Sequence, residues 1–241
     1  MALLVVVAAA FVRGRRPGDG VAAGRFWAGL AVVAVALLSP ISTYGEALLS
    51  VHMVQHLLLA FVAAPLLASS GAGVALLAAL PPSVAGLVRR VGSSRLARSP
   101  LLAWAAFAGA GWVIHFSPLF DLALRQPVVH AFEHALFLGT GVWFWWPVVA
   151  AKSRLSHPVR LLYVALGMPQ NTFLALAIFS AGHPLYEAYE QLGRAWGPSL
   201  LDDQRLGGGI MWVAGDLTLL AAVLTVAAAW ATREMAATSE E

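Results

Sequence analysis

Residues 50–59 read Ser-Val-His-Met-Val-Gln-His-Leu-Leu-Leu and place two histidines and a methionine inside a long apolar run. The histidines, His52 and His56, are four residues apart, so on a helix they lie on one face about one turn from each other. Ionisable side chains at membrane depth are costly and usually face a protein interior where they have a function. The same spacing recurs in His130-Ala-Phe-Glu-His134. Whether the two pairs meet therefore decides how the chain is interpreted.

The composition is that of a membrane protein. Of the 241 residues, 60% are hydrophobic and only 11% are charged, which is too apolar for an ordinary soluble domain. The chain contains no cysteine, so disulfides and a Cys-x-x-Cys metal or redox site are excluded. The formal charge is +3, but the basic residues form short clusters between apolar runs, as topology signals do, and do not indicate nucleic-acid binding.

The apolar runs predict an all-α fold, a polytopic bundle of seven transmembrane helices that forms a single membrane domain over residues 1–241. The predicted spans cover residues 1–12, 25–41, 46–69, 100–117, 127–149, 160–182 and 207–231. The first run would rise only about 18 Å, against a hydrocarbon core of about 30 Å. We therefore expect it to be a partial span or to continue a chain that starts further upstream.

The placement of basic residues predicts the orientation of the bundle. Twelve of the fifteen Lys and Arg residues lie in the first, third and fifth connectors or after the last span. The positive-inside rule then places the N-terminus outside and the C-terminus inside. The third connector, residues 70–99, carries four arginines and two apolar pieces separated by Pro81-Pro82. It fits either a segment lying along the inner membrane surface or a plain linker.

Five histidines fall in one layer. A rise of about 1.5 Å per residue places them at or outside the membrane midplane on three helices, with Met53 and Met211 at similar depths; they are His52, His56, His115, His130 and His134. A lone intramembrane histidine often has only a structural hydrogen-bonding role. Five structural roles would need five desolvated partners, whereas one metal ion satisfies several imidazoles at once. The layer therefore predicts metal or cofactor ligation.

The residue types favour copper over other metals. Imidazole suits copper, zinc, iron and nickel, and thioether sulfur adds a preference for Cu(I). Plain packing is the alternative interpretation of the methionines, and zinc or iron are the alternative metals. Glu133 is expected to accept a hydrogen bond from an imidazole rather than to ligate directly. The predicted metal ligands are His52, Met53, His56, His115, His130, His134 and Met211.

Other features predict local structure. Pro169 predicts a kink in the sixth span, and the glycines at 207–209 and 215 predict close helix packing in the last. Asp216 needs a partner there, for which we expect a histidine or an arginine. The acidic residues of the outer connector fit either a surface that attracts cations or a solvated loop; they are Glu187, Glu190, Asp202 and Asp203.

Short polar motifs are distributed over residues 39–231. They are His-Met-Val-Gln-His at 52–56, Trp112…His115, His130-x-x-Glu-His134, Phe144-Trp-Trp-Pro147, Pro184-Leu-Tyr186, Asp203-Gln204, Gly208-Gly209 and Met211-Trp212. Together they resemble the CtaG family, the multi-spanning assembly factors of bacterial caa-type cytochrome c oxidase. The resemblance implies a seven-helix protein of the bacterial cell (inner) membrane that helps to mature the oxidase by handling copper. It points to the same histidines and to Met53.

We therefore expect a copper-binding assembly factor that is not an enzyme. Its expected partners are cytochrome c oxidase subunits, a copper ion and membrane lipid, and whether it forms a homo-oligomer is left open. The main alternative is a membrane electron carrier that binds haem between two histidines. A membrane di-iron oxygenase and a scaffold with structural histidines are further alternatives.

Overall fold

The computed structural model describes residues 1–14, 20–150, 155–193 and 196–238, and within these ranges the chain is helical and contains no strand. Fifteen helical elements follow one another: α1 (Ala2–Gly14), α2 (Gly20–Leu38), α3 (Pro40–Gly45), α4 (Leu49–Leu57), the π-helix η1 (Leu58–Ala63), α5 (Ala64–Ser69), α6 (Ala72–Ala78), α7 (Pro82–Ser93), α8 (Pro100–His115), α9 (Leu119–Arg125), α10 (Pro127–Val149), α11 (His157–Ala165), α12 (Gly167–Phe179), α13 (Glu187–Gln191) and α14 (Leu200–Thr238).

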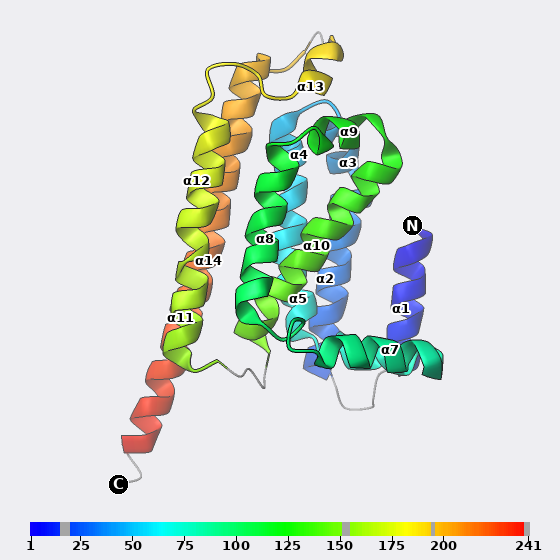
Figure 1. Cartoon of the computed structure of the whole chain (residues 1–241), viewed down its shortest axis with the longest axis vertical. Coiled ribbons are helices and arrows are strands. Elements are labelled where there is room, and N and C mark those ends of the chain that lie inside the picture. Colours follow the sequence, from blue (N-terminus) through cyan, green and yellow to red (C-terminus); the bar gives the residue numbers. More distant parts are fainter. Residues whose placement is uncertain (15–19, 151–154, 194–195, 239–241) are drawn as a thin grey trace.

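The long helices run roughly side by side and form one bundle (Figure 1). The α4–η1–α5 segment, α8 and α10 occupy its centre, the pair formed by α11–α12 and α14 covers one side, and α2 and α1 lie on the other (Figure 1). The short helices α3, α9 and α13 gather at one end, while α7 crosses the opposite end (Figure 1). The α4–η1–α5 segment is therefore packed between α2, α10 and α14.

Several helices are long and apolar enough to cross a membrane. By length and composition these are Gly20–Leu38, Leu49–Ser69, His157–Phe179 and Leu200–Thr238, and the pair α8 and α9, bent by 69°, would make a fifth. The other two predicted spans, 1–12 and 127–149, are the helices α1 and α10. The described residues thus form a helical protein with four to five candidate spans. Seven spans and the orientation of the termini remain predictions.

The span that carries the first histidine pair changes its winding immediately after that pair. Residues Leu58–Ala63 form a π-helix between α4 and α5, a wider turn that is often found at functional sites. The indole Nε1 of Trp145 donates to the carbonyl oxygen of Ala60 at 2.9 Å, so a side chain of α10 satisfies backbone that the wider winding leaves exposed. This contact ties the π-helix to α10.

The helix is interrupted just before Pro169, the residue at which the sequence predicts a kink. Helix α11 ends at Ala165 and α12 begins at Gly167. Proline has no N–H to donate and its ring clashes with the carbonyl four residues earlier, which here belongs to Ala165. The interruption therefore falls where the missing hydrogen bond would have been.

The partner predicted for Asp216 is wrong. Its carboxylate accepts hydrogen bonds from Asn171 Nδ2 at 2.9 Å and from Thr172 Oγ1 at 2.5 Å, both on α12. Neither a histidine nor an arginine is involved in these bonds. Neutral donors suffice because two hydrogen bonds from fixed side chains satisfy the carboxylate oxygens inside the bundle. The contact joins α12 to α14.

The close packing predicted for the glycines of α14 is confirmed. A Cβ atom at Gly207 would lie 3.2 Å from Met53 Cγ on α4, and one at Gly208 would lie 2.9 Å from the backbone nitrogen of Phe179 on α12. At Gly215 the nearest atom would be Asn171 Nδ2 at 2.6 Å. Three glycines thus allow α14 to pack directly on two neighbouring helices, one of which carries His52.

Replacing Gly208 with alanine is expected to lower the apparent melting temperature of the purified protein. The new methyl group would meet backbone atoms of Phe179 and Ala175 at 2.9 to 3.0 Å, and overpacking of this kind costs about 1–3 kcal/mol. Gly209→Ala is the matched control, because its nearest neighbour is a Phe179 ring carbon at 3.9 Å and alanine is the better helix former. Equal melting temperatures for the two variants would contradict the packing described for α14.

Candidate metal centre

The helix that carries His52 is anchored at its first turn by the last helix. The carboxylate of Asp203 on α14 accepts hydrogen bonds from the backbone nitrogens of Leu49 at 2.8 Å and Ser50 at 3.2 Å, and from Ser50 Oγ at 2.5 Å. The free N–H groups at the start of a helix need such acceptors, and a negative charge there is favourable. Asp203 therefore fixes the position of α4 relative to α14.

Substituting Asp203 with alanine is expected to destabilise the protein by about 2 kcal/mol, because loss of a helix cap costs about 0.5–2 kcal/mol and the backbone N–H groups left behind are buried. The control is Asp202→Ala, since Asp202 is exposed and its carboxylate accepts from Ser199 Oγ in the same first turn. Thermal unfolding followed by circular dichroism measures both. A change for Asp203→Ala no larger than that for Asp202→Ala would contradict the capping role.

Four side chains from α4 and α10 converge inside the bundle: His52, His130, Glu133 and His134. Each offers one ligand atom, and these atoms all lie within 4.8 Å of one another. The ligand atoms of one tetrahedral ion lie about 3–3.5 Å apart when its bonds are about 2 Å long. A small movement of these side chains would therefore bring the group to the geometry of a metal site.

The side chains of this group are ionisable, yet most of them are buried, which is uncommon in proteins. The exposed fraction is 0% for His52, 1% for Glu133 and 9% for His134, while His130 is half-buried. The His130 ring stacks on that of His52 with centroids 5.3 Å apart, and it lies 4.2 Å from that of His134. A carboxylate and three imidazoles thus share one nearly water-free space.

Many polar atoms of this group and of the neighbouring His56 and His115 have no hydrogen-bond partner among the residues that the structure describes. They include both ring nitrogens of His52 and His56, both carboxylate oxygens of Glu133, and Nε2 of His115, His130 and His134. A buried polar atom left without a partner costs about 1–3 kcal/mol, and native proteins contain few of them. A bound cation would satisfy imidazole lone pairs and a carboxylate together.

Glu133 lies between the histidines of α4 without bonding to them. Its carboxylate oxygens are 3.7 Å from His52 Nε2 and 3.6 Å from His56 Nε2, which is too long for a hydrogen bond. The expectation that it accepts a hydrogen bond from an imidazole is therefore wrong. The sequence contained a signal for its position beside His130, because Glu133 is three residues after His130 and both residues lie on one side of α10.

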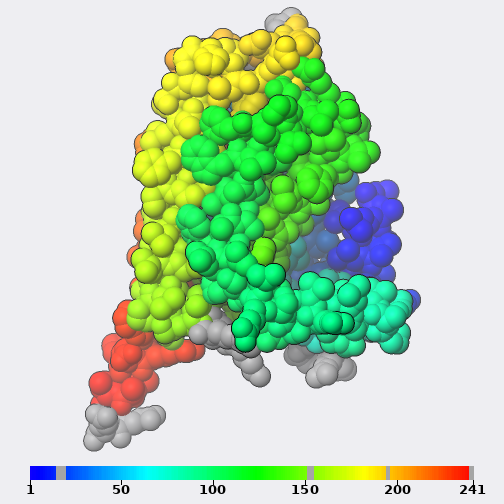
Figure 2. Space-filling view, viewed as in Figure 1, coloured from blue at the N-terminus to red at the C-terminus, as the bar shows by residue number. Residues whose placement is uncertain are grey.

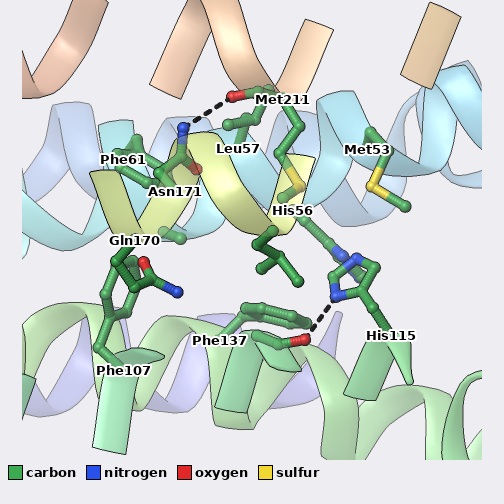
Figure 3. Close-up of a pocket in the computed structure, with 13 residues that line it drawn as sticks. Met53, His56, Leu57, Phe61, Phe107, His115, Phe137, Gln170, Asn171 and Met211 are labelled. Carbon is green, nitrogen blue, oxygen red and sulfur yellow. Dashed lines mark hydrogen bonds between the residues drawn. The ribbon is translucent and has the colours of Figure 1, made fainter. Parts of the chain in front are cut away.

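A pocket adjoins the group on the side of α12 and α14. Met53, His56, His115, Phe137 and Met211 are among its lining residues, and its volume is about 40 Å³. Figure 3 shows the thioether of Met211 extending from α14 towards His56, and His115 beside His56. The centroids of these two imidazole rings are 5.9 Å apart. The pocket therefore presents imidazole and thioether groups to one small space.

The tautomer of His115 follows from its hydrogen bond. Its Nδ1 lies 2.7 Å from the carbonyl oxygen of Gly111, one turn earlier on α8, and a carbonyl can only accept, so Nδ1 carries the proton. The lone pair is then on Nε2, which is buried and has no partner among the described residues. His115 is thus held by its own helix, and its Nε2 faces the pocket without a hydrogen bond from those residues.

His115 also borders a cleft that opens to the surface at the α9 and α13 end. The cleft has a volume of about 1010 Å³, and its lining includes Asp121, Arg125, Tyr186 and Glu187. Arg125 Nη2 donates to Glu187 Oε2 at 3.1 Å, so its charge is compensated there. Burial, with Asp121 nearby, raises the pKa of the Tyr186 hydroxyl above its usual value, so that this phenol is neutral at physiological pH. His115 lines both this surface cleft and the inner pocket, and it is the residue that the two spaces share.

Comparison with known proteins assigns the family. Residues 5–233 match the sequence profile of the cytochrome c oxidase caa3 assembly factors, Caa3_CtaG. The chain belongs to this family. Its CtaG motifs therefore lie inside a match that covers nearly the whole sequence, and a role in oxidase assembly is the function that the family carries.

Similar mycobacterial proteins are longer than this family member. Proteins of Mycobacterium bovis and Mycobacterium tuberculosis, both described as uncharacterized, are 29% identical over 258 residues, which covers 99% of this chain and 39% of theirs. A Mycobacterium leprae protein, also described as uncharacterized, is 29% identical over 94% of this chain and 37% of its own. The chain thus spans about two-fifths of the length of these relatives. No solved structure matches it significantly.

For this CtaG-family chain, the structure brings all seven predicted ligands together in two adjoining spaces. His52, His130 and His134 lie in the group with Glu133, while Met53, His56, His115 and Met211 line the pocket beside it. The remaining histidines are elsewhere: His157 begins α11 and His183 follows α12. Whether any of these residues binds a metal stays a prediction.

Proposed function

We propose that this CtaG-family protein binds copper inside its helical bundle and helps to deliver it to a copper centre of cytochrome c oxidase. The observation that carries the proposal is the buried group of three imidazoles and one carboxylate whose ligand atoms lie within 4.8 Å of one another. Membership of an oxidase assembly family supports the client. The copper ion is cargo in this proposal, and the protein acts as a carrier and not as an enzyme.

The donor atoms support copper more than other metals. The chain has no thiolate to offer, since it contains no cysteine. Imidazole nitrogens bind copper more tightly than other divalent first-row metals, and thioethers add selectivity for Cu(I). Met53 and Met211 bring thioethers to the pocket next to the imidazole group. The proposed ligand set is therefore His52, His130, Glu133 and His134, with His56, His115 and the two methionines as an adjoining set.

The proposed route for copper follows the contiguous cavities. Asp121 at the surface cleft would attract a cation, and His115 borders both the cleft and the inner pocket. His56 lines the same pocket and lies 3.6 Å from Glu133 through its Nε2. An ion could therefore pass from the cleft through His115 and His56 to the buried group by exchange of one ligand at a time.

The geometry favours a bare ion over haem, the alternative considered from the sequence. The rings of His52, His130 and His134 contact one another directly, with neighbouring centroids 4.2 to 5.3 Å apart, which leaves no slot for a porphyrin plane between them. The pocket lined by His56 and His115, at about 40 Å³, is also far too small for a haem group. A colourless protein without a Soret band is the expected result for the purified chain.

We further propose that the chain lies in the bacterial inner membrane with seven spans, its N-terminus outside and the histidine layer in the outer half. The distribution of arginines supports this orientation, and the candidate spans support the membrane location. The cleft that borders His115 would then open to the side where the copper arrives. Oxidase subunits are the proposed partners.

Complementation tests the delivery of copper. In a bacterium that lacks its own family member, this protein and its His157→Ala variant are expected to restore the copper content and activity of the purified oxidase. The His130→Ala variant is expected to restore neither, although its abundance in the membrane is unchanged. Full restoration by His130→Ala would overturn the proposal, because the buried group would then have no part in maturation of the oxidase.

A further inference from the structure

A hollow at the end opposite the cleft has no part in the proposed copper route. It is a groove of about 670 Å³ between α6, α7, the start of α8 and the end of α10. Helix α7 lies across this end of the bundle (Figure 1) and forms a ledge beneath the ends of the long helices (Figure 2). The groove therefore lies where the long helices end.

The walls of the groove are apolar and partly exposed. Val74 and Val88 line one side, and Val142, Trp143 and Trp146 line the other. The exposed fraction is 67% for Val74 and 47% for Trp146. A contiguous apolar patch at a protein surface usually marks a binding site or a membrane contact. Tryptophan at the end of a spanning helix is typical of the membrane interface.

The groove carries positive charge that the described residues do not neutralise. Arg89 and Arg98 are among its lining residues, and Arg90 and Arg95 belong to the same segment. The sequence has no aspartate or glutamate between Glu46 and Asp121. Within the part of the chain that the structure describes, none of these four arginines forms an ion pair.

Two hydrogen bonds hold the rim of the groove in place. Trp143 Nε1 donates to the carbonyl oxygen of Ala97 at 2.9 Å, and Arg98 Nε donates to the carbonyl oxygen of Gly92 at 3.3 Å. The first bond ties α10 to the segment before α8, and the second ties that segment to α7. The bond to Gly92 uses only Nε of Arg98, so among the described residues its terminal guanidinium nitrogens remain available to a ligand. The two bonds together hold the rim in place before a ligand binds.

We propose that this groove binds an anionic phospholipid. The headgroup phosphate lies against the guanidinium groups of Arg89 and Arg98, and an acyl chain lies along Val142 and Trp146. Guanidinium is the cationic group best suited to bind phosphate oxygens through paired hydrogen bonds, and basic pockets between spanning helices bind anionic headgroups. The apolar wall selects a lipid over a soluble phosphate. This inference does not depend on the copper proposal.

Lipid binding to the full-length protein in detergent tests the inference. Native mass spectrometry with added phosphatidylglycerol is expected to show retained lipid, whereas the zwitterionic phosphatidylcholine is retained far less. The double variant Arg89→Gln/Arg98→Gln is expected to bind phosphatidylglycerol about 25-fold more weakly, because each arginine near an anionic lipid contributes about fivefold in affinity. The control Arg125→Gln/Arg205→Gln removes two charges at the other end of the bundle and should change nothing.

Three outcomes would overturn the inference. They are equal retention of the two lipids, equal loss in the control variant, and displacement of phosphatidylglycerol by an equal concentration of soluble glycerol phosphate, which would indicate a site for phosphate alone. If the double arginine variant does not fold, Val88→Glu replaces it, since it adds a negative charge to the groove and leaves the arginines in place. It is expected to weaken retention of phosphatidylglycerol by tenfold or more, and unchanged retention would contradict the proposed site.

Discussion

Replacing His52 with alanine is expected to weaken copper binding by about tenfold or more. His52 is fully buried, its ring lies 4.3 Å from that of His56 and 5.3 Å from that of His130, and its Nε2 is 3.7 Å from Glu133. Even groups that only support a metal ligand change its affinity by about 10–100-fold. Competition with a Cu(I) chelator measures the dissociation constant.

The matched control for this prediction is His157→Ala. His157 is the first residue of α11 and lies outside both the buried group and the pocket. Its removal takes one imidazole from the chain without touching the proposed site, so the affinity for copper should not change. If His52→Ala and His157→Ala bind copper equally well, the histidines do not share an ion and the proposal fails.

Replacing Glu133 with glutamine is expected to weaken copper binding by about 10–100-fold while the fold is retained. Glutamine has nearly the same shape, so packing inside the bundle is kept, but it has no negative charge to offset that of the cation. The carboxylate is 1% exposed and forms no hydrogen bond with the residues that the structure describes, so its charge interacts strongly with any ion placed among the imidazoles. Chelator competition measures the affinity for copper, and a thermal melt of the apoprotein measures whether the fold is retained.

Two further variants sharpen this second prediction. Glu133→Asp keeps the charge but withdraws it by one methylene, so it should bind copper with an affinity between those of the glutamine variant and the unmodified protein. Glu190→Gln removes an exposed carboxylate from α13 and should leave the affinity unchanged. A glutamine variant with unaltered copper affinity would show that the buried charge has no role in binding, and would leave only imidazoles in the proposed site.

The sequence predicted the convergence of the histidines because two simple quantities determine it. The spacing of four residues puts His52 and His56, and likewise His130 and His134, on one face of a helix. The rise per residue then gives each side chain a depth. Neither quantity gives the rotation of a helix about its own axis, which decides the neighbour that each side chain meets. The division of the ligands into a buried group and an adjoining pocket therefore could not be predicted.

Other details depend on contacts between segments far apart in the chain. Asp203 caps a helix that begins 154 residues earlier, and Asp216 bonds to neutral side chains of α12. Glu133 was expected to bond to an imidazole, but its oxygens lie 3.6 to 3.7 Å from two of them. Such partners follow from the packing of helices, to which glycines in α14 contribute, and local sequence patterns do not encode that packing.

X-ray absorption at the copper edge tests the central claim most directly. The purified protein, loaded with one equivalent of Cu(I), is compared with the His52→Ala/His134→Ala double variant. We predict bound copper whose spectrum contains scattering from at least two imidazole rings in the unmodified protein, and little or no bound copper in the double variant. Copper that binds without imidazole scattering, or that binds equally to the double variant, would contradict the account.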